Sequence, residues 1–284
     1  MNKLTRERRI AVISALVEGN SIRATCRMTG TAKGTVLSLL EDIGAACRAY
    51  QDTHLVDLPC RRIQCDEIWC FVGTKQRNVS PEQAELGYGD AWTWVALDAE
   101  TKLVPSWLVG LRDAGYAFEF MNDLARRLRN RVQLTTDGHK AYLEAVEGAF
   151  GSNVDYAMLV KLYGAQPDER RYSPPVCLGA HPNVVQGNPE PAHVSTSYIE
   201  RQNLTMRMSM RRFTRLTNAF SKKIENLEHA VSLHYMHYNF CRPHSSLGNM
   251  TTPAIAAGIS DHVWGIDEIV ALLEQAEKTE AISN

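Results

Sequence analysis

The stretch RRIQCDEIWCFV, from Arg61 to Val72, decides the fold of this chain. Apolar residues occupy both of its alternating sets of positions, which is typical of a central strand covered on both faces. Two adjacent acids, Asp66 and Glu67, stand in the middle of this stretch. A buried carboxylate is costly unless it is paired or bound to a metal ion. The stretch therefore predicts a buried strand that carries a chemical site.

The segments after this strand predict a mixed sheet with helices packed on it. Two alternating segments joined by a turn at Asp98 are expected to form an antiparallel hairpin. A later short strand ends at Asp137-Gly138, so a third acid follows a strand directly. The expected order after 61–72 is strand 91–97, strand 102–110, helix 114–130, strand 132–136, helix 139–149 and strand 155–161.

A helix is expected from Ser195 to Phe213, and it carries a further candidate acid, Glu200. Its apolar residues recur at close to the helical period. From Arg201 to Lys223 every formal charge is positive. An acid at the head of such a row fits a metal ligand beside a polyanion. The plainer interpretation is a glutamate that complements the helix dipole, with basic residues on a solvated face.

The first 48 residues predict three short helices with a glycine-containing turn, Met28-Thr29-Gly30, between the second and the third. Helix, turn and helix in this arrangement are typical of a DNA-binding domain whose second helix enters the major groove. Basic residues at 3, 6, 8 and 9 precede it and favour DNA. A generic three-helix bundle is the alternative. The residues expected to face DNA at the start of the third helix are Thr31, Lys33 and Thr35.

Composition is that of a globular protein, with 44% hydrophobic and 22% charged residues and a net charge of −1 over 284 residues. No apolar run approaches the ~18 residues of a membrane span, so no membrane partner is expected. Seven cysteines, an odd number, favour reduced thiols and a cytoplasmic location. Cys60, Cys65 and Cys70 lack a fourth ligand nearby, so no zinc is expected.

Three short blocks of the sequence resemble those of a DDE transposase from a bacterial insertion sequence, in its short single-frame form. The catalytic core of that family is RNase H-like, or retroviral-integrase-like. The tail YNFCRPHSSL, from Tyr238 to Leu247, is similar to one found after the core in many such transposases. The three blocks are QCDEIW (Gln64–Trp69), TDGHKAY (Thr136–Tyr142) and SYIERQN (Ser197–Asn203).

The resemblance implies that Asp66, Asp137 and Glu200 are the catalytic metal ligands. Hard oxygen ligands suit two Mg²⁺ or Mn²⁺ ions, which promote in-line displacement at phosphorus. Because neighbours on a strand point to opposite faces, Glu67 competes with Asp66 for this role. The resemblance favours Asp66 and leaves Glu67 and His139 as supporting groups. The residues expected to contact DNA in the core are Arg207, Arg211, Arg212, Arg215 and Lys140.

The chain is therefore expected to divide into a helix-turn-helix domain and an RNase H-like α/β domain with a five-stranded mixed sheet. The spacing from Asp137 to Glu200 is longer than usual for the integrase group, and a Pro/Gly-rich insertion at 166–193 accounts for the excess. The expected divisions are 1–48 for the helix-turn-helix, 49–60 for a linker, 61–245 for the catalytic domain and 246–284 for a helical tail.

The function that the resemblance implies is DNA transposition. Such an enzyme binds the inverted repeats at the ends of its element, cleaves a strand to a 3′-OH and joins it to target DNA, as a homodimer or larger assembly and without a small-molecule cofactor. Three alternatives stay open. They are a DNA-binding transcriptional regulator with a non-catalytic second domain, a nuclease that lacks strand transfer, and a decayed transposase kept only for binding.

Overall fold

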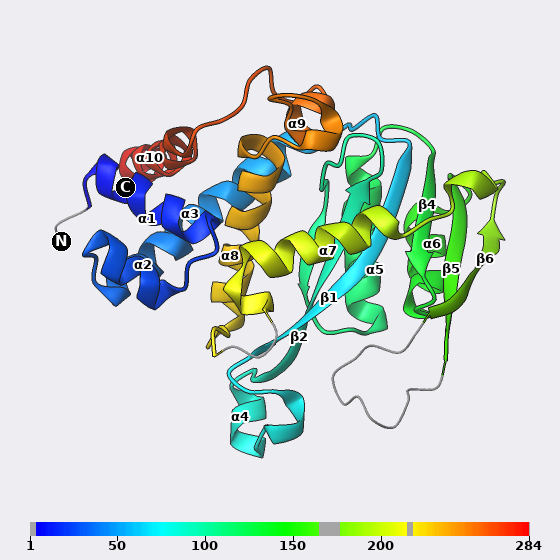
Figure 1. Cartoon of the computed structure of the whole chain (residues 1–284), viewed down its shortest axis with the longest axis horizontal. Helices are drawn as coiled ribbons and strands as arrows, with labels where there is room; N and C mark the ends of the chain where they lie inside the picture. Colours follow the sequence, from blue (N-terminus) through cyan, green and yellow to red (C-terminus); the bar gives the residue numbers. More distant parts are fainter. Residues whose placement is uncertain (1–3, 165–176, 215–217, 284) are drawn as a thin grey trace.

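The computed structural model describes residues 4–164, 177–214 and 218–283. Its centre is a six-stranded sheet in the order β3-β2-β1-β4-β5-β6 (Figure 1). β1 is antiparallel to β2 and parallel to β4, β5 is parallel to β4, and β6 is antiparallel to β5. The predicted RNase H-like α/β core is confirmed. The strands are β1 (Arg62–Val72), β2 (Gly89–Asp98), β3 (Trp107–Gly110), β4 (Val132–Asp137), β5 (Val154–Tyr163) and β6 (Cys177–Gln186).

The sixth strand corrects the prediction of five strands and of an irregular 166–193 insertion. β6 lies at the edge of the sheet and its side chains are exposed or half-buried along its whole length. With no buried face it has no alternation of apolar and polar residues, which is the signal by which a strand is recognised in a sequence. Backbone pairing with β5 forms it instead. The part of the insertion at 165–176 lies outside the described residues.

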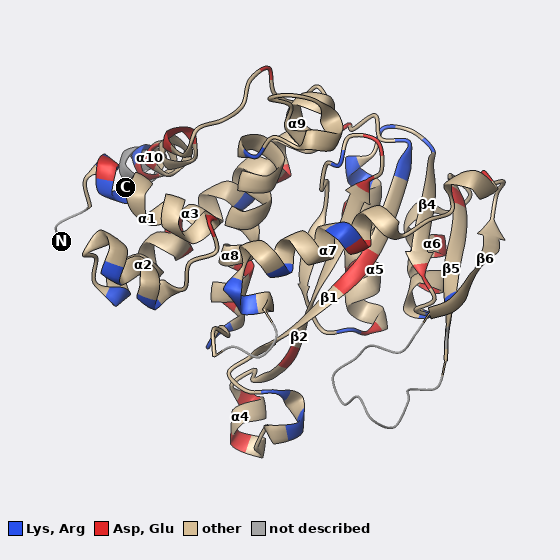
Figure 2. Ribbon diagram, in the orientation of Figure 1, with Lys and Arg blue, Asp and Glu red and all other residues tan. Residues whose placement is uncertain are grey.

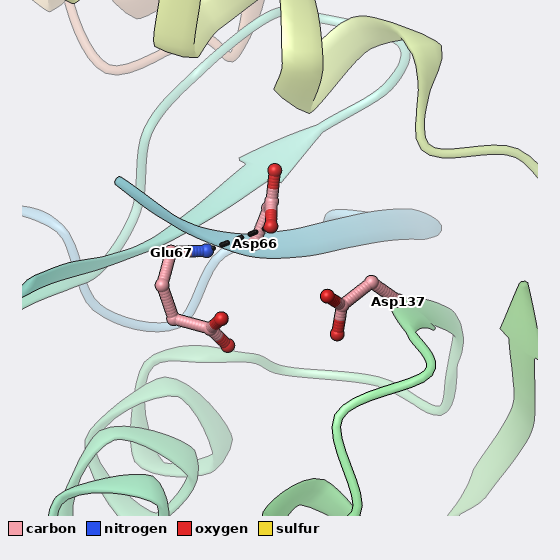
Figure 3. A group of neighbouring side chains, drawn as sticks. All are labelled: Asp66, Glu67 and Asp137. Carbon is pink, nitrogen blue, oxygen red and sulfur yellow. Dashed lines mark hydrogen bonds between the residues drawn. The ribbon is translucent and has the colours of Figure 1, made fainter. Parts of the chain in front are cut away.

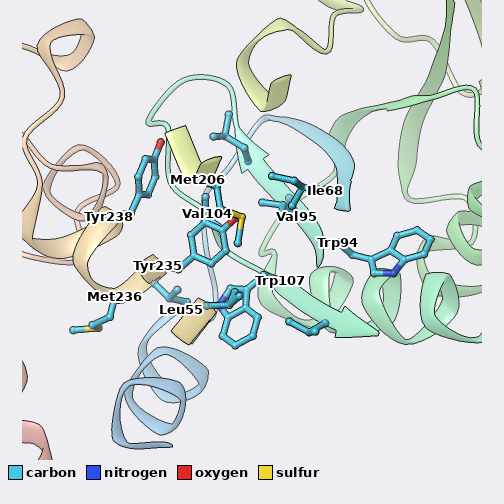
Figure 4. Packing of buried hydrophobic residues seen from close by; sticks show 14 of the residues in the cluster. Leu55, Ile68, Trp94, Val95, Val104, Trp107, Met206, Tyr235, Met236 and Tyr238 are labelled. Carbon is cyan, nitrogen blue, oxygen red and sulfur yellow. The ribbon is translucent and has the colours of Figure 1, made fainter. Parts of the chain in front are cut away.

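Helices cover both faces of the sheet. α5 (Ala114–Arg127) and α6 (Ala141–Phe150) lie on one face, where Trp94 of β2 packs against Phe120 and Tyr142. α7 (Ser197–Ser209) lies on the opposite face, against β1 and β2 (Figure 1). Figure 4 shows Met206 of α7 beside Tyr235 in the continuous core that joins the layers, and the Tyr235 hydroxyl donates to the Met206 sulfur at 3.6 Å.

Two elements near the site are shorter than expected. β3 begins at Trp107 and not at Lys102, because Pro105 has no N–H to donate to the neighbouring strand. The backbone N–H and carbonyl of Val104 are hydrogen-bonded to the side-chain amide of Asn239. α7 ends at Ser209, and a separate 3₁₀ turn, η3 (Arg211–Phe213), follows. Arg211 therefore does not continue the helical face that carries Glu200.

The N-terminal helices form as expected up to α3. They are α1 (Arg6–Val17), α2 (Ile22–Thr29) and α3 (Lys33–His54). Ser21 caps α2, and Gly30 ends it in the left-handed conformation. α3 runs on through residues that were expected to form a linker, and Gln51 inside that stretch donates to the Ser232 carbonyl. Ser232 belongs to α8 (Ile224–Met236), which continues as a π-helical turn, η4 (His237–Cys241).

The C-terminal segment returns to the N-terminal helices. After a short α9 (Pro253–Ala256), α10 (Ile266–Ser283) packs against α1 and α3 (Figure 1). Arg9 of α1 and Glu277 of α10 form an ion pair at 3.0 Å, and Arg6 lies 3.9 Å from Glu274. The basic residues that favoured DNA in the sequence thus include two whose charge is used inside the molecule.

The remaining elements are small and belong to connecting segments. The connection between β1 and β2 contains a 3₁₀ turn, η1 (Gln76–Asn78), and a one-turn helix, α4 (Pro81–Glu85), which begins with a capping box at Ser80. Two further 3₁₀ turns are η2 (Pro191–His193) and η5 (Ser245–Leu247). Among the described residues, no helix has the length and apolar character needed to cross a membrane.

Candidate active site

Three acids meet where β1 and β4 lie side by side. Cys65 pairs with Thr136 in the parallel ladder, so the next residues, Asp66 and Asp137, are neighbours. One carboxylate oxygen from each of Asp66, Glu67 and Asp137 lies within 4.8 Å of the others (Figure 3). Carboxylates in this number and spacing are the donor set that Mg²⁺ and Mn²⁺ prefer. Among the described residues this group is the one that has metal-binding geometry.

Asp66 faces α7. Its Oδ2 accepts a hydrogen bond from Asn203 Nδ2 at 2.8 Å, and its Oδ1 accepts from the Glu67 backbone N–H at 2.9 Å. Burial raises the pKa of Asp66 to about 7, with further increases from the charges of Glu67 and Asp137. A carboxylate in this position binds a proton or a cation more readily than one in water.

Glu67 faces the other side of the sheet. Its side chain is 1% exposed, and its Oε2 accepts from Arg112 Nε at 3.0 Å. Burial, followed by the charge of Asp137, raises the pKa of Glu67, while the neighbouring Tyr142 hydroxyl and Arg112 act in the opposite direction. The sequence presented Asp66 and Glu67 as competitors, and the structure gives each a different partner.

Arg112 is a site residue that the sequence analysis missed. Besides Glu67, it reaches Asp137 with Nη2 to Oδ2 at 3.6 Å, and its guanidinium lies 4.9 Å from the centre of the Trp92 ring. It stands between β3 and α5, in a connection where an exposed arginine is ordinary. No periodicity or motif marks it, because its role depends on reaching across the sheet to β1.

Asp137 ends β4, and its Oδ1 accepts the His139 backbone N–H at 2.9 Å. The His139 ring lies 5.9 Å from that of Trp94, and its Nε2 is buried without a partner among the described residues. Burial and the charge of Arg112 lower the pKa of His139. The backbone of His139 therefore fixes Asp137, while its neutral ring packs beside the cluster.

Glu200 borders the cluster but is held by other groups. It forms an ion pair with Lys161 of β5 and accepts a hydrogen bond from the Thr196 hydroxyl. Asn203, which holds Asp66, follows Glu200 by three positions on α7, a spacing that puts the two side chains about 5–6 Å apart at Cβ. The charge of Glu200 also raises the pKa of Asp66. The geometry therefore brings Glu200 beside the acids without including it among them.

The basic residues expected to contact DNA in the core have varied surroundings. Arg207 donates to the Phe213 carbonyl at 3.1 Å, and Arg211 is exposed on η3. Arg212 is largely covered, its Nε donates to Ser221 at 2.8 Å, and burial lowers its pKa to about 10. Lys140 is exposed at the start of α6, directly after the Asp137 turn. Arg215 lies outside the described residues.

The residues expected to read DNA at the start of α3 differ in exposure. Lys33 and Thr35 are exposed in its first turn. Thr31 is only 5% exposed, and it does not cap the helix, because the capping position is Ala32, which makes no side-chain hydrogen bond. Its buried side chain therefore has little surface to offer a ligand.

No protein-family model matches the chain, and no curated protein matches it. Solved structures with similar arrangements include the Mos1 strand transfer complex, at 14% identity over 55% of this chain and 58% of that one, with a TM-score of 0.24. Another is a piggyBac transposase synaptic complex with hairpin DNA, at 10% identity over 94% of this chain and 69% of that one, with a TM-score of 0.40. A third is a Mos1 mariner paired-end complex with Mn, at 10% identity over 83% of this chain and 76% of that one, with a TM-score of 0.27. The chain spans little more than half of the first structure's chain. At these values the function has to be argued from the residues themselves.

Proposed function

We propose that this protein is a DNA transposase of the DDE type that uses divalent metal ions. The observation that carries the proposal is the convergence of Asp66, Glu67 and Asp137, whose oxygens lie within 4.8 Å of one another, with Glu200 on the adjacent helix. Two Mg²⁺ or Mn²⁺ ions bound there would supply activation of the attacking oxygen and stabilisation of the leaving oxygen in phosphoryl transfer. We propose Asp66, Asp137 and Glu200 as their ligands.

The chain's own residues would prepare this site in three ways. Asn203 and the Glu67 N–H orient Asp66, and the His139 N–H orients Asp137. Arg112 neutralises Glu67, so that Asp66 and Asp137 can carry the negative charge that a cation needs. Lys140, exposed beside the Asp137 turn, is positioned to contact a phosphate.

The N-terminal helices would bind the ends of the element. Lys33 and Thr35, exposed in the first turn of α3, are in the position from which a recognition helix contacts base edges. Because the two ends of an element must be brought together, we propose a homodimer or larger assembly on DNA. We also propose that the protein acts in the cytoplasm, at the nucleoid, because its DNA would be there.

The test is a strand-cleavage and strand-transfer assay on the DNA that flanks the gene, with and without Mg²⁺. The wild type should release a 3′-OH end and join it to a target plasmid only with the metal present. Asp137→Asn should abolish both steps while end binding in a mobility-shift assay is retained.

Each alternative function has its own result in this assay. Cleavage without a target-joined product would leave a nuclease. End binding without cleavage, in Mg²⁺ or Mn²⁺, would leave a regulator or a decayed transposase. Full activity of the Asp137→Asn variant would end the metal-site assignment, because that residue is central to the cluster.

A further inference from the structure

A cleft separates the N-terminal helices from the catalytic half of the molecule. It has a volume of about 660 Å³ and lies between α2, α3 and the end of α1 on one side and η3, residues 218–222 and α8 on the other. Figure 2 shows Lys and Arg positions on the ribbon of α2. Of the described residues that line the cleft, none is an aspartate or a glutamate. Its cationic lining residues are Arg23, Lys33, Arg211, Arg212 and Lys222.

Arg212 lies deepest among these cations. Its guanidinium is largely covered, and its one hydrogen-bond partner among the described residues is the neutral hydroxyl of Ser221, at 2.8 Å. Burial lowers its pKa to about 10. Partial burial of a cation without a carboxylate partner is costly, since no counter-charge replaces the hydration that the guanidinium loses. An anion bound in the cleft would compensate this charge.

Two buried polar atoms on α8 also favour an anion as the ligand of the cleft. Asn226 Oδ1 and His234 Nε2 are buried without partners among the described residues, and both side chains line the cleft. Burial, with the charges of His237 and Arg242, lowers the pKa of His234 to about 3, so its ring is neutral. A neutral imidazole can donate from Nε2, and a rotated Asn226 amide can donate from its nitrogen. Such donors, in the same cleft as the Arg212 guanidinium, suit an oxyanion.

We propose that this cleft binds phosphate groups of the DNA backbone and thereby links the N-terminal helices to the catalytic core. Lys33 belongs to the first turn of α3, whereas Lys222 and Arg211 are exposed on the core side, so a duplex read by α3 would pass over both rims. The inference of a phosphate site is argued from the residues that line the cleft. The identification of DNA as the source of the phosphate rests on the proposed function.

The test measures duplex affinity against NaCl concentration, without divalent metal, for the wild type and three cleft variants. Each lost phosphate contact should reduce the slope of log K against log[salt] by about 0.9. We expect that reduction for Lys222→Gln, which is exposed and will fold, and for Arg212→Gln. The matched control is Lys278→Gln, an equal charge change at an exposed position of α10.

Asn226→Asp is the third variant, and it adds the missing carboxylate inside the cleft. It should raise the melting temperature, because it compensates Arg212, and weaken duplex binding about tenfold or more, because it repels phosphate. Neither effect is expected from the control. Tripolyphosphate, used as a probe without DNA, should raise the melting temperature of the wild type and not that of Asn226→Asp.

Outcomes separate this inference from the proposed function. Unchanged salt slopes for Lys222→Gln and Asn226→Asp, with tight duplex binding by both, would overturn the cleft and leave the transposase proposal intact. Protection by tripolyphosphate that Asn226→Asp removes, together with a wild type that binds no duplex, would support the phosphate site and reject DNA as its source. Failure of Arg212→Gln to fold would leave the other two variants to decide.

Discussion

Charged residues follow opposite rules at the α1–α10 interface and at the sheet acids. At the interface every buried charge has a counterpart: Arg9 is 9% exposed and lies 3.0 Å from Glu277. At the junction of β1 and β4, Asp66, Glu67 and Asp137 crowd together (Figure 3). Arg112 is the one cation in contact with them among the described residues. Pairing is typical of architecture, whereas buried like charges indicate a ligand.

Charged residues in this chain therefore serve either the packing of the fold or a ligand site. The sequence suggested that the basic start of the chain favours DNA, but two of those arginines face the acidic α10. The sequence also placed two acids in a buried strand, where unpaired carboxylates are costly, and in the fold these two acids lie close to each other. A charge should therefore be assigned to a ligand only after its partner inside the molecule has been sought.

The largest expected effect separates Glu200 from Glu67 as the third ligand. Glu200→Gln should reduce strand cleavage by about 10³-fold, since loss of a metal ligand costs several kcal/mol of transition-state stabilisation. Glu67→Gln should retain activity within about tenfold, because Glu67 is paired with Arg112. Single-turnover cleavage rates at saturating Mg²⁺ measure both. The reverse order of effects would assign the site to Asp66, Glu67 and Asp137.

The next effect is a gain of stability from Asp66→Asn. The pKa of Asp66 is raised, so the folded state is penalised when this carboxyl ionises, and wild-type stability is lost as pH rises from the ordinary aspartate range through about 7. At pH 8 in EDTA the variant should be more stable by about 2–4 kcal/mol. Near pH 4 the two proteins should be equally stable. Urea unfolding at both pH values measures this.

The structure around Asp66 suits that substitution. Asn203 Oδ1 is buried without a partner among the described residues, so its amide can rotate and accept from the new amide nitrogen. No hydrogen bond is then lost. Equal stability of the variant and the wild type at pH 8 would mean that solvent or a bound cation already relieves the carboxyl.

The sequence was most informative along the buried central strands. β1 was expected from Arg61 to Val72 and runs from Arg62, and β4 was expected over 132–136, directly before Asp137, and includes Asp137 as its last residue. Two of the three proposed ligands therefore meet where parallel strands must bring them together. Glu200 could be assigned to a helix but not to a partner, because its contact with Lys161 depends on how α7 crosses the sheet.

What the sequence could not predict depends on contacts between distant segments. The Arg9–Glu277 pair joins residues 268 positions apart, and neither helix shows its partner by periodicity. Arg212 reads as one more cation in a basic row, and only the packed structure reveals that it is covered. β6 has no buried face at all. In each case the structure depends on a contact with a distant segment, which no pattern in the sequence reveals.

A smaller effect is expected at the paired interface. Arg9→Met should lower the free energy of unfolding by about 1–3 kcal/mol, because Arg9 is covered while Glu277 remains 29% exposed. Duplex binding by the folded protein should not change. The matched control is Arg8→Met, which removes the same charge at the exposed neighbouring position. Weaker DNA binding by Arg9→Met than by Arg8→Met would contradict the structural role of this charge.

The smallest effect concerns the ion pair that occupies Glu200. Glu200 is 44% exposed, so Lys161→Met should change the free energy of unfolding by less than about 1 kcal/mol. The more informative effect of Lys161→Met is on the Mg²⁺ concentration that cleavage requires. Because Lys161 competes with a cation for the Glu200 carboxylate, its removal should lower the Mg²⁺ concentration for half-maximal cleavage by about two- to fivefold. Lys278→Met, far along α10, should leave that concentration unchanged. A higher Mg²⁺ requirement for Lys161→Met would mean that the lysine positions Glu200 for the metal, so that this pair would resemble Arg9–Glu277 and not the crowded acids at the junction of β1 and β4.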